Sequence, residues 1–291
     1  MYNYHLYGQQ LCCDFKIDSL VELKKKTNSI SIRSLEETNS FNLDSFSLNK
    51  QHGYFCKKDL CKIEVSDSKN IHYAFDDKVS DFQKFQIISS QPFAYLFYQM
   101  GKLVLHGSAI EIKGRAFLFI GVSNSGKSFF ASNLLNESKL ITEDICVIDI
   151  LDDNFYIRPS IPVIKIDNPA IINSKNIKSK HKIIDKRNRE AIVLNDSKFS
   201  SKAVKIEACF VLNFSEKFAI NKIDFNKSFA SILLSSFQSN PMLSSKNHDS
   251  DIHHKIGDFL NTVPLYNIER NKRFNDFDIV SKFINKTFFN A

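Results

Sequence analysis

The chain has 291 residues, of which 43% are hydrophobic, and a formal net charge of +7. This length suits one large domain or two modest ones, and the hydrophobic content supports a buried core. No apolar run approaches the roughly 18 residues of a membrane-spanning helix, and the opening Met-Tyr-Asn-Tyr-His does not resemble a secretory signal. The modest, scattered positive charge suits an anionic ligand and does not predict nucleic-acid binding. We therefore expect neither a membrane partner nor a nucleic-acid partner.

The six cysteines indicate a reducing compartment. No pair has C-x-x-C spacing, and Cys146 and Cys209 lie in apolar, strand-like runs where buried thiols are expected. We therefore expect a cytoplasmic protein.

Residues 1–90 predict a small β-rich domain. Alternating runs such as Ile30–Arg33 and Lys62–Val65 are typical of strands. The segment Gln91–Met100 has a proline near its first position and predicts a helix, which we expect to begin a second domain over residues 91–291.

An antiparallel hairpin is predicted next. The runs Leu103–Ile112 and Arg115–Ile120 are separated by the two residues Lys113-Gly114, which is a hairpin pattern. If Ile112 pairs with Arg115, the register places His106 opposite Gly121. Two interpretations of His106 stay open: a functional group at the mouth of the following loop, or a histidine packed in the core.

Residues 121–128 read Gly-Val-Ser-Asn-Ser-Gly-Lys-Ser, a complete G-x-x-x-x-G-K-[ST] phosphate-binding pattern. Its glycines allow backbone N–H groups to converge on phosphate oxygens, Lys127 can reach the β- and γ-phosphates, and Ser128 can bind Mg²⁺. The flanking sequence predicts a strand before the loop and a helix after it, with Phe130 and Leu134 on one face. The expected nucleotide-binding residues are Gly121, Val122, Ser123, Asn124, Ser125, Gly126, Lys127, Ser128 and Phe129.

Two adjacent carboxylates, Glu143 and Asp144, follow about fifteen residues after the loop and precede an apolar strand. Phosphoryl transfer needs an acidic residue near the metal and a group that accepts the hydroxyl proton. Because successive side chains of a strand diverge, we expect one carboxylate to face the metal and the other the acceptor. A surface Glu-Asp pair is the alternative. Further strands are predicted at 155–157, 163–166 and 206–213, and helices at 229–237 and 279–288.

Residues 174–190 form a basic run, which we interpret as a solvated loop. A functional alternative is that this run contacts phosphates or an acidic peptide. Lys186 and Arg187 are its best functional candidates. Arg270, Lys272 and Arg273 form a second basic cluster.

Together these residues resemble the HPr kinase/phosphorylase family. The shared features are Leu105-His106-Gly107 in a hairpin, the loop at 121–128, and the acidic pair that begins a strand. The resemblance implies an α/β fold with a P-loop core, whose mixed sheet is entered through the antiparallel hairpin, beside the small β-rich amino-terminal domain. It also implies ATP and Mg²⁺ as cofactors and assembly into a homo-oligomer.

Within that family, the chain is most similar to the branch found with ribosomally made peptides, notably the lasso-peptide kinases. Residues 4–8, 101–109 and 158–162 carry this similarity. The chain departs from the family by having Glu143 where an aspartate is usual and by lacking a second glycine inside the loop. It has no clear copy of the signature stretch of the bifunctional enzymes, so phosphorolysis and HPr as substrate are not implied.

These observations predict an ATP-dependent kinase that phosphorylates a serine or another hydroxyl of a peptide or small protein. Lys127 would hold the phosphates, Ser128 and Asp144 would bind Mg²⁺, and Glu143 would act as the base with His106 orienting it. Two alternatives stay open: a kinase of a small molecule, and a module that binds nucleotide or a leader peptide without transferring phosphate.

Overall fold

The computed structural model describes residues 1–24, 30–35, 41, 43–49, 51–185, 187, 189–237 and 250–289. The described residues fall into two compact units. The first comprises Met1–Val104 with Ser236–Ile252, and the second comprises Leu105–Ser235 with His253–Ala291. The larger, second unit contains all the residues predicted to carry function.

The first unit is built on a seven-stranded sheet with the order β1-β2-β3-β7-β6-β5-β4. The predicted strands at 30–33 and 62–65 are confirmed as β3 and β6, and the predicted helix at 91–100 is confirmed as α2. Helix α2 packs against this sheet, and Val104 ends the first segment of the unit. The elements are β1 (Tyr2–Leu6), β2 (Gln9–Cys13), β3 (Ile30–Ser34), β4 (Ser45–Leu48), β5 (His52–Lys57), β6 (Cys61–Ser66), β7 (Asn70–Phe75), α1 (Asp81–Ile88) and α2 (Gln91–Gln99).

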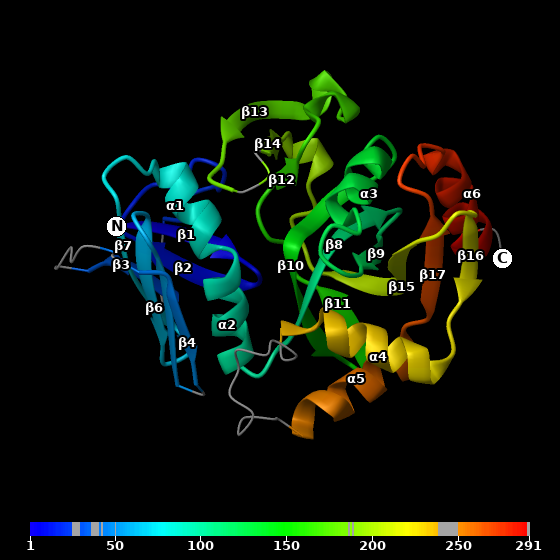
Figure 1. Ribbon diagram of the computed structural model, residues 1–291, viewed down its shortest axis with the longest axis horizontal. Coiled ribbons are helices and arrows are strands. Elements are labelled where there is room, and N and C mark those ends of the chain that lie inside the picture. Colours follow the sequence, from blue (N-terminus) through cyan, green and yellow to red (C-terminus); the bar gives the residue numbers. More distant parts are fainter. Residues whose placement is uncertain are drawn as a thin grey trace. The chain divides into compact units, whose positions relative to one another are not determined.

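The second unit contains a mixed seven-stranded sheet with the order β11-β10-β8-β9-β15-β17-β16, and a three-stranded sheet with the order β12-β14-β13. Figure 1 shows β8, β9, β15 and β17 side by side in the larger sheet. The strands are β8 (Leu103–Ile112), β9 (Arg115–Ile120), β10 (Lys139–Leu151), β11 (Asn154–Ile157), β12 (Val163–Ile166), β13 (Ile177–Lys182), β14 (Glu190–Leu194), β15 (Val204–Phe214), β16 (Ala219–Lys222) and β17 (Leu265–Arg270). The α-helices are α3 (Lys127–Leu134), α4 (Phe225–Ser235), α5 (Ser250–Thr262) and α6 (Phe277–Phe288).

The predicted hairpin is confirmed, and so is its register. Strands β8 and β9 are antiparallel, with Ile112 opposite Arg115 and Gly107 opposite Ile120. One further step along the two strands brings His106 level with Gly121. Strand β15 is parallel to β9 and to β17, so the sheet is mixed, as expected. The predicted strands after residue 150 and the helix at 279–288 are also confirmed, and the helix predicted at 229–237 corresponds to α4, which begins at Phe225 and ends at Ser235.

Phenylalanine rings fill the core between the larger sheet and helices α3 and α6. Phe119 of β9 contacts Phe130 of α3 and stacks on Phe210 of β15, with ring centroids 5.7 and 5.5 Å apart. Because β9 leads directly into the 121–128 loop and α3 follows it, this packing fixes both ends of the loop.

Phe119→Ala is therefore expected to lower the free energy of unfolding of this unit by about 3–5 kcal/mol, since it removes a fully buried ring and leaves a cavity. Urea denaturation measures this change. Phe225→Ala, at an exposed phenylalanine of α4, serves as the control and should leave the transition nearly unchanged. Equal effects of the two substitutions would show that the Phe119 cluster does not support the loop.

Candidate active site

The glycine-rich loop, residues 121–128, connects β9 to α3 as predicted. Gly121 and Gly126 have φ values of +142° and +90°, which side chains disfavour. A Cβ at Gly121 would lie 2.8 Å from the carbonyl oxygen of Leu212. The amino terminus of α3 therefore opens onto a curved backbone, an arrangement that presents N–H groups to an anion.

Arg270, at the end of β17, contacts the backbone of the glycine-rich loop. The side chain is 3% exposed, and its Nη2 donates to the carbonyl oxygen of Ser125 over 2.7 Å. Its guanidinium lies near the rings of Phe130 and Phe214, at 5.1 and 4.9 Å from their centroids. Arg270, predicted as part of a second basic cluster, is thus buried against the loop.

Gly126→Ala is expected to weaken Mg·ATP binding by about 5- to 30-fold, because φ of +90° costs a side chain about 1–2 kcal/mol. The added Cβ would also lie 2.4 Å from Nη2 of Arg270. Isothermal titration calorimetry measures the affinity. Gly257→Ala in α5 is the matched control, because a Cβ there meets no atom within 4 Å. Wild-type affinity in Gly126→Ala would contradict the assigned loop function.

Lys127 begins α3 and is buried. Its Nζ donates to the carbonyl oxygens of Gly121 and Val122, both over 3.0 Å, so the ammonium lies at the loop itself. Burial lowers the pKa of Lys127, and the carboxylates of Asp144 and Glu143 oppose this shift. The predicted placement of a cation at the loop is therefore matched by the contacts.

The acidic pair lies inside β10 rather than at its beginning. Asp144 has a φ of +75°, and the hydroxyl of Thr142 donates to the carbonyl oxygen of Ile145 over 2.6 Å. This irregularity within the strand accompanies a break in its alternation, since Glu143 and Asp144 both contact Nζ of Lys165 and line the same cavity. The expectation that their side chains diverge, which assumed regular strand geometry, is wrong for this reason.

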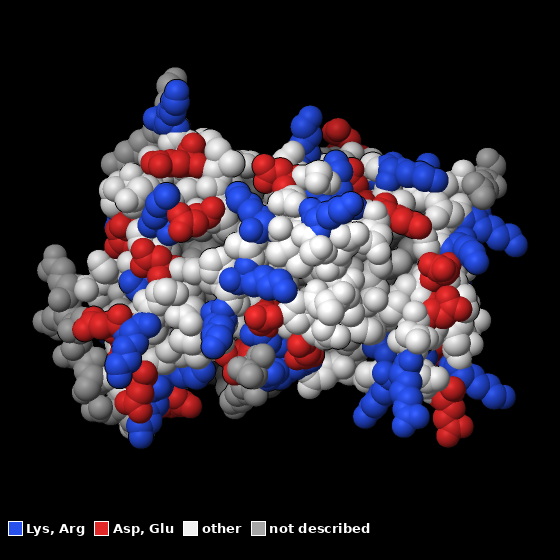
Figure 2. Space-filling view, turned by 90° about the horizontal axis from the view of Figure 1, so that it is seen from above, with Lys and Arg blue, Asp and Glu red and all other residues white. Residues whose placement is uncertain are grey.

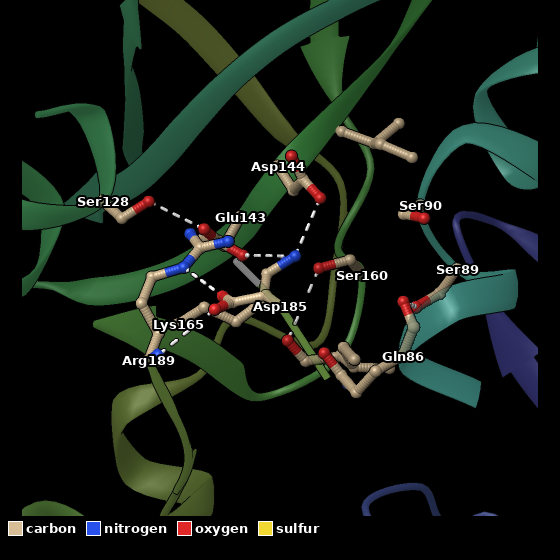
Figure 3. A network of polar contacts seen from close by, with 12 residues as sticks. Gln86, Ser89, Ser90, Ser128, Glu143, Asp144, Ser160, Lys165, Asp185 and Arg189 are labelled. Carbon is tan, nitrogen blue, oxygen red and sulfur yellow. Dashed lines mark hydrogen bonds and ion pairs between the residues drawn. The ribbon is translucent and has the colours of Figure 1, made fainter. Parts of the chain in front are cut away.

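Lys165 of β12 joins the two carboxylates. Its Nζ lies 2.8 Å from Oδ2 of Asp144 and 3.4 Å from Oε2 of Glu143. Figure 3 shows these two contacts together with the hydrogen bond from Ser128 to Glu143. Burial opposes ionisation of Asp144, but Lys165 and His106 outweigh it and hold the pKa of Asp144 well below its usual value.

Ser128 is hydrogen-bonded to Glu143 and not to Asp144, the carboxylate predicted to share Mg²⁺ with it. Its Oγ donates to Oε1 of Glu143 over 2.7 Å, whereas the prediction grouped Ser128 with Asp144. The Glu143 side chain is 5% exposed and that of Asp144 is 27% exposed. Asp144 is thus the carboxylate that a molecule from solution can reach.

His106 stands at the mouth of the cavity rather than in the core. Its side chain is 50% exposed, and Nδ1 lies 3.2 Å from Oδ1 of Asp144 and 3.0 Å from the carbonyl oxygen of the same residue. This settles the two interpretations of its location: His106 lines the cavity beside the acidic pair.

The basic run contributes two arginines to the cavity. Arg187 donates to Oδ1 of Asn124 in the loop over 2.9 Å and pairs with Asp167, and Arg189 pairs with Asp185. The expectation of a solvated loop is partly wrong, because residues 177–182 form strand β13. Lys186, predicted beside Arg187, lies outside the described residues.

These groups surround one cavity of about 450 Å³. On the face drawn in Figure 2, basic and acidic side chains are interspersed, so no broad surface of a single charge sign is visible there.

Of the predicted nucleotide-binding residues, Gly121, Val122 and Ser125 belong to the loop but do not line the cavity. The lining residues are His106, Gly107, Ser108, Ser123, Asn124, Gly126, Lys127, Ser128, Phe129, Glu143, Asp144, Lys165, Ile166, Asp167, Asn168, Ile171, Arg187 and Arg189.

The donor set fits Mg²⁺ that arrives with a nucleotide. Within the described part of the chain, no group of three or more His, Cys, Asp or Glu residues has metal-binding geometry. A hydroxyl and one or two carboxylates suffice for Mg²⁺, which keeps several waters and takes phosphate oxygens as its other ligands. Ser128 and Glu143, already 2.7 Å apart, are suitable protein ligands.

Two charged residues that line the cavity, Lys165 and Asp167, were not predicted from the sequence, whereas Arg189 belongs to the basic run that was. Lys165 interrupts the apolar run Val163–Ile166, and a single charge inside a buried strand is a signal that could have drawn attention to it.

No protein-family profile and no curated protein sequence match this chain. Among solved structures, it is similar to the Hpr(Ser) kinase/phosphatase from Coxiella burnetii, with a TM-score of 0.32 and 8% sequence identity. The alignment covers 63% of this chain and 93% of the other. A TM-score of this size supports no conclusion about activity, so the functional assignment depends on the site residues. None of the helices within the described ranges has the length and apolar character to cross a membrane.

Proposed function

We propose that this chain is an ATP-dependent kinase that transfers the γ-phosphate to a serine hydroxyl of a peptide or small protein. One observation carries the proposal: the glycine-rich loop and an ionised carboxylate beside a histidine line the same cavity, with Asp144 accessible from solution. The acceptor class rests on the sequence resemblance of residues 101–165 to peptide kinases. Precursor peptides made by the ribosome are the acceptors that we propose to test first.

The nucleotide would bind through the loop amides and Lys127, and the contacts favour a division of labour between the two carboxylates. Glu143 and Ser128 would hold Mg²⁺, because their side chains are in contact and that of Glu143 is shielded from solvent. When bound, Mg²⁺ would supply positive charge that neutralises the charge developing on the phosphates during transfer.

Asp144 would orient the acceptor hydroxyl and accept its proton. The hydroxyl oxygen forms a bond to the γ-phosphorus while the bond from that phosphorus to the bridging oxygen of ADP breaks. In a loose transition state the proton leaves late, so a carboxylate with a low pKa serves mainly by orienting the hydroxyl. His106, in contact with Asp144, would position that carboxylate. Arg187 and Arg189 line the same cavity and would supply further positive charge to the phosphates.

The test is transfer of label from [γ-³²P]ATP. The full chain is incubated with Mg²⁺ and, separately, with a pool of serine-containing peptides, with a pool of hydroxylated metabolites and with no acceptor. Lys127→Met is the blank. Label in the peptides supports the proposal, and label in the metabolites alone rejects the peptide acceptor. Tight ATP binding without transfer to any acceptor would identify a nucleotide-binding module instead and reject the kinase.

A further inference from the structure

Lys165 is a buried cation for which the proposed reaction assigns no role. The side chain comes from the middle of β12, is 13% exposed, and touches both carboxylates of the acidic pair. Its contact with Asp144, at 2.8 Å, is a charge-assisted hydrogen bond. The ammonium therefore lies between the two groups that a divalent cation would use if it bound this pair alone.

The electrostatics of the pair depend on this ammonium. Two neighbouring carboxylates with little exposure to water repel each other and lose hydration, and each effect favours uptake of a cation. The charges of Asp144 and Glu143 more than offset the effect of burial on Lys165 and raise its pKa, so the ammonium stays charged. A divalent ion that approached the pair would have to compete with a positive charge already in contact.

The wider cavity contains further charged groups. Among the described residues that line it, four permanent or near-permanent cations face three carboxylates; the cations are Lys127, Lys165, Arg187 and Arg189. Asp185 adds a fourth carboxylate, because it pairs with Arg189, so the described charges nearly balance without nucleotide, and the cation in contact with the acidic pair is Lys165. The phosphates of ATP shift that balance by bringing several negative charges, which attract a divalent cation.

We propose that Lys165 is a built-in counter-ion that keeps free divalent metal out of the acidic pair, so that Mg²⁺ enters only together with the nucleotide. The proposal rests on the proposed function in one respect, that ATP is the ligand of this cavity. It adds a role for a residue of this chain: Lys165 sets the order of binding and prevents occupation of the site by metal alone.

Binding of Mn²⁺, followed by the loss of the free-ion signal in electron paramagnetic resonance, tests the proposal without any need for turnover. For the full chain without nucleotide, we expect weak binding in the wild type and binding at least about tenfold tighter in Lys165→Met, which removes the ammonium that both carboxylates share. A non-hydrolysable ATP analogue should give tight binding in both and reduce the difference between them. Lys165→Arg keeps the charge and should bind Mn²⁺ as weakly as the wild type.

Lys178→Met, at an exposed lysine of β13, is the matched control and should behave as the wild type. Equal Mn²⁺ affinity of Lys165→Met and the wild type would overturn the proposal. So would tight binding of Mn²⁺ by the nucleotide-free wild type, a result that needs no variant and holds even if Lys165→Met does not fold.

The outcome is separable from that of the kinase test. If no acceptor is phosphorylated but the Mn²⁺ pattern holds, the kinase fails and the role of Lys165 stands. If transfer occurs and Mn²⁺ binds the nucleotide-free wild type tightly, the kinase stands and the role of Lys165 fails.

Discussion

Lys127→Met is expected to reduce phosphoryl transfer by about 10³-fold or more. The Lys127 ammonium lies at the glycine-rich loop and lines the cavity, and charge neutralisation of the transferred group is a major part of catalysis in such sites. Methionine keeps the length of the side chain and removes the charge, so the packing of α3 should change little. The rate of label transfer from [γ-³²P]ATP under single-turnover conditions measures the effect.

The exposed Lys178→Met provides the control for loss of one positive charge and should transfer at the wild-type rate. A thermal melt of Lys127→Met should match that of the wild type, since burial of its ammonium is itself unfavourable. A rate within tenfold of the wild type in Lys127→Met would show that phosphate does not bind at this loop.

Asp144→Asn is expected to lower transfer by about 10²–10⁴-fold while changing ATP affinity only a few-fold. The amide has the shape of the carboxylate but cannot accept the hydroxyl proton, and it loses the ion pair with Lys165. Single-turnover transfer at saturating Mg·ATP, combined with calorimetric ATP binding, separates the two effects.

Glu143→Gln is the companion variant that distinguishes the roles of the carboxylates. If Glu143 holds the metal with Ser128, this substitution should raise the Mg²⁺ concentration needed for half-maximal rate, and excess Mg²⁺ should restore part of the rate. If instead Glu143→Gln abolishes transfer at every Mg²⁺ concentration and Asp144→Asn shifts the Mg²⁺ requirement, the roles are exchanged.

Local sequence predicted the parts of the site that depend on neighbouring residues in the chain. The two-residue connection at Lys113-Gly114 allowed one register for the hairpin, and this register brought His106 level with Gly121. The glycines, lysine and serine of the loop are spaced for one backbone path between β9 and α3. In each case the interacting groups are few residues apart or joined by a tight turn, so geometry follows from spacing.

The arrangement of the acidic pair could not be predicted in this way. Regular alternation would separate Glu143 from Asp144, but the positive φ of Asp144 and the contact from Thr142 to Ile145 turn both toward one cavity. No glycine or proline at this place signals the irregularity. Spacing alone therefore could not show that Ser128 bonds to Glu143 and not to Asp144.

The sequence by itself determined the phosphate-binding pattern, the hairpin that leads to it and the presence of two carboxylates nearby, because these depend on short-range backbone geometry. Only the tertiary structure decided which charges meet. Lys165 reaches the acidic pair from β12, and Arg270 reaches the loop from β17; both come from strands distant in the chain. Such long-range pairing is set by how the sheets pack. The sequence around a lysine or arginine in a strand does not show which residue it will contact in the folded protein.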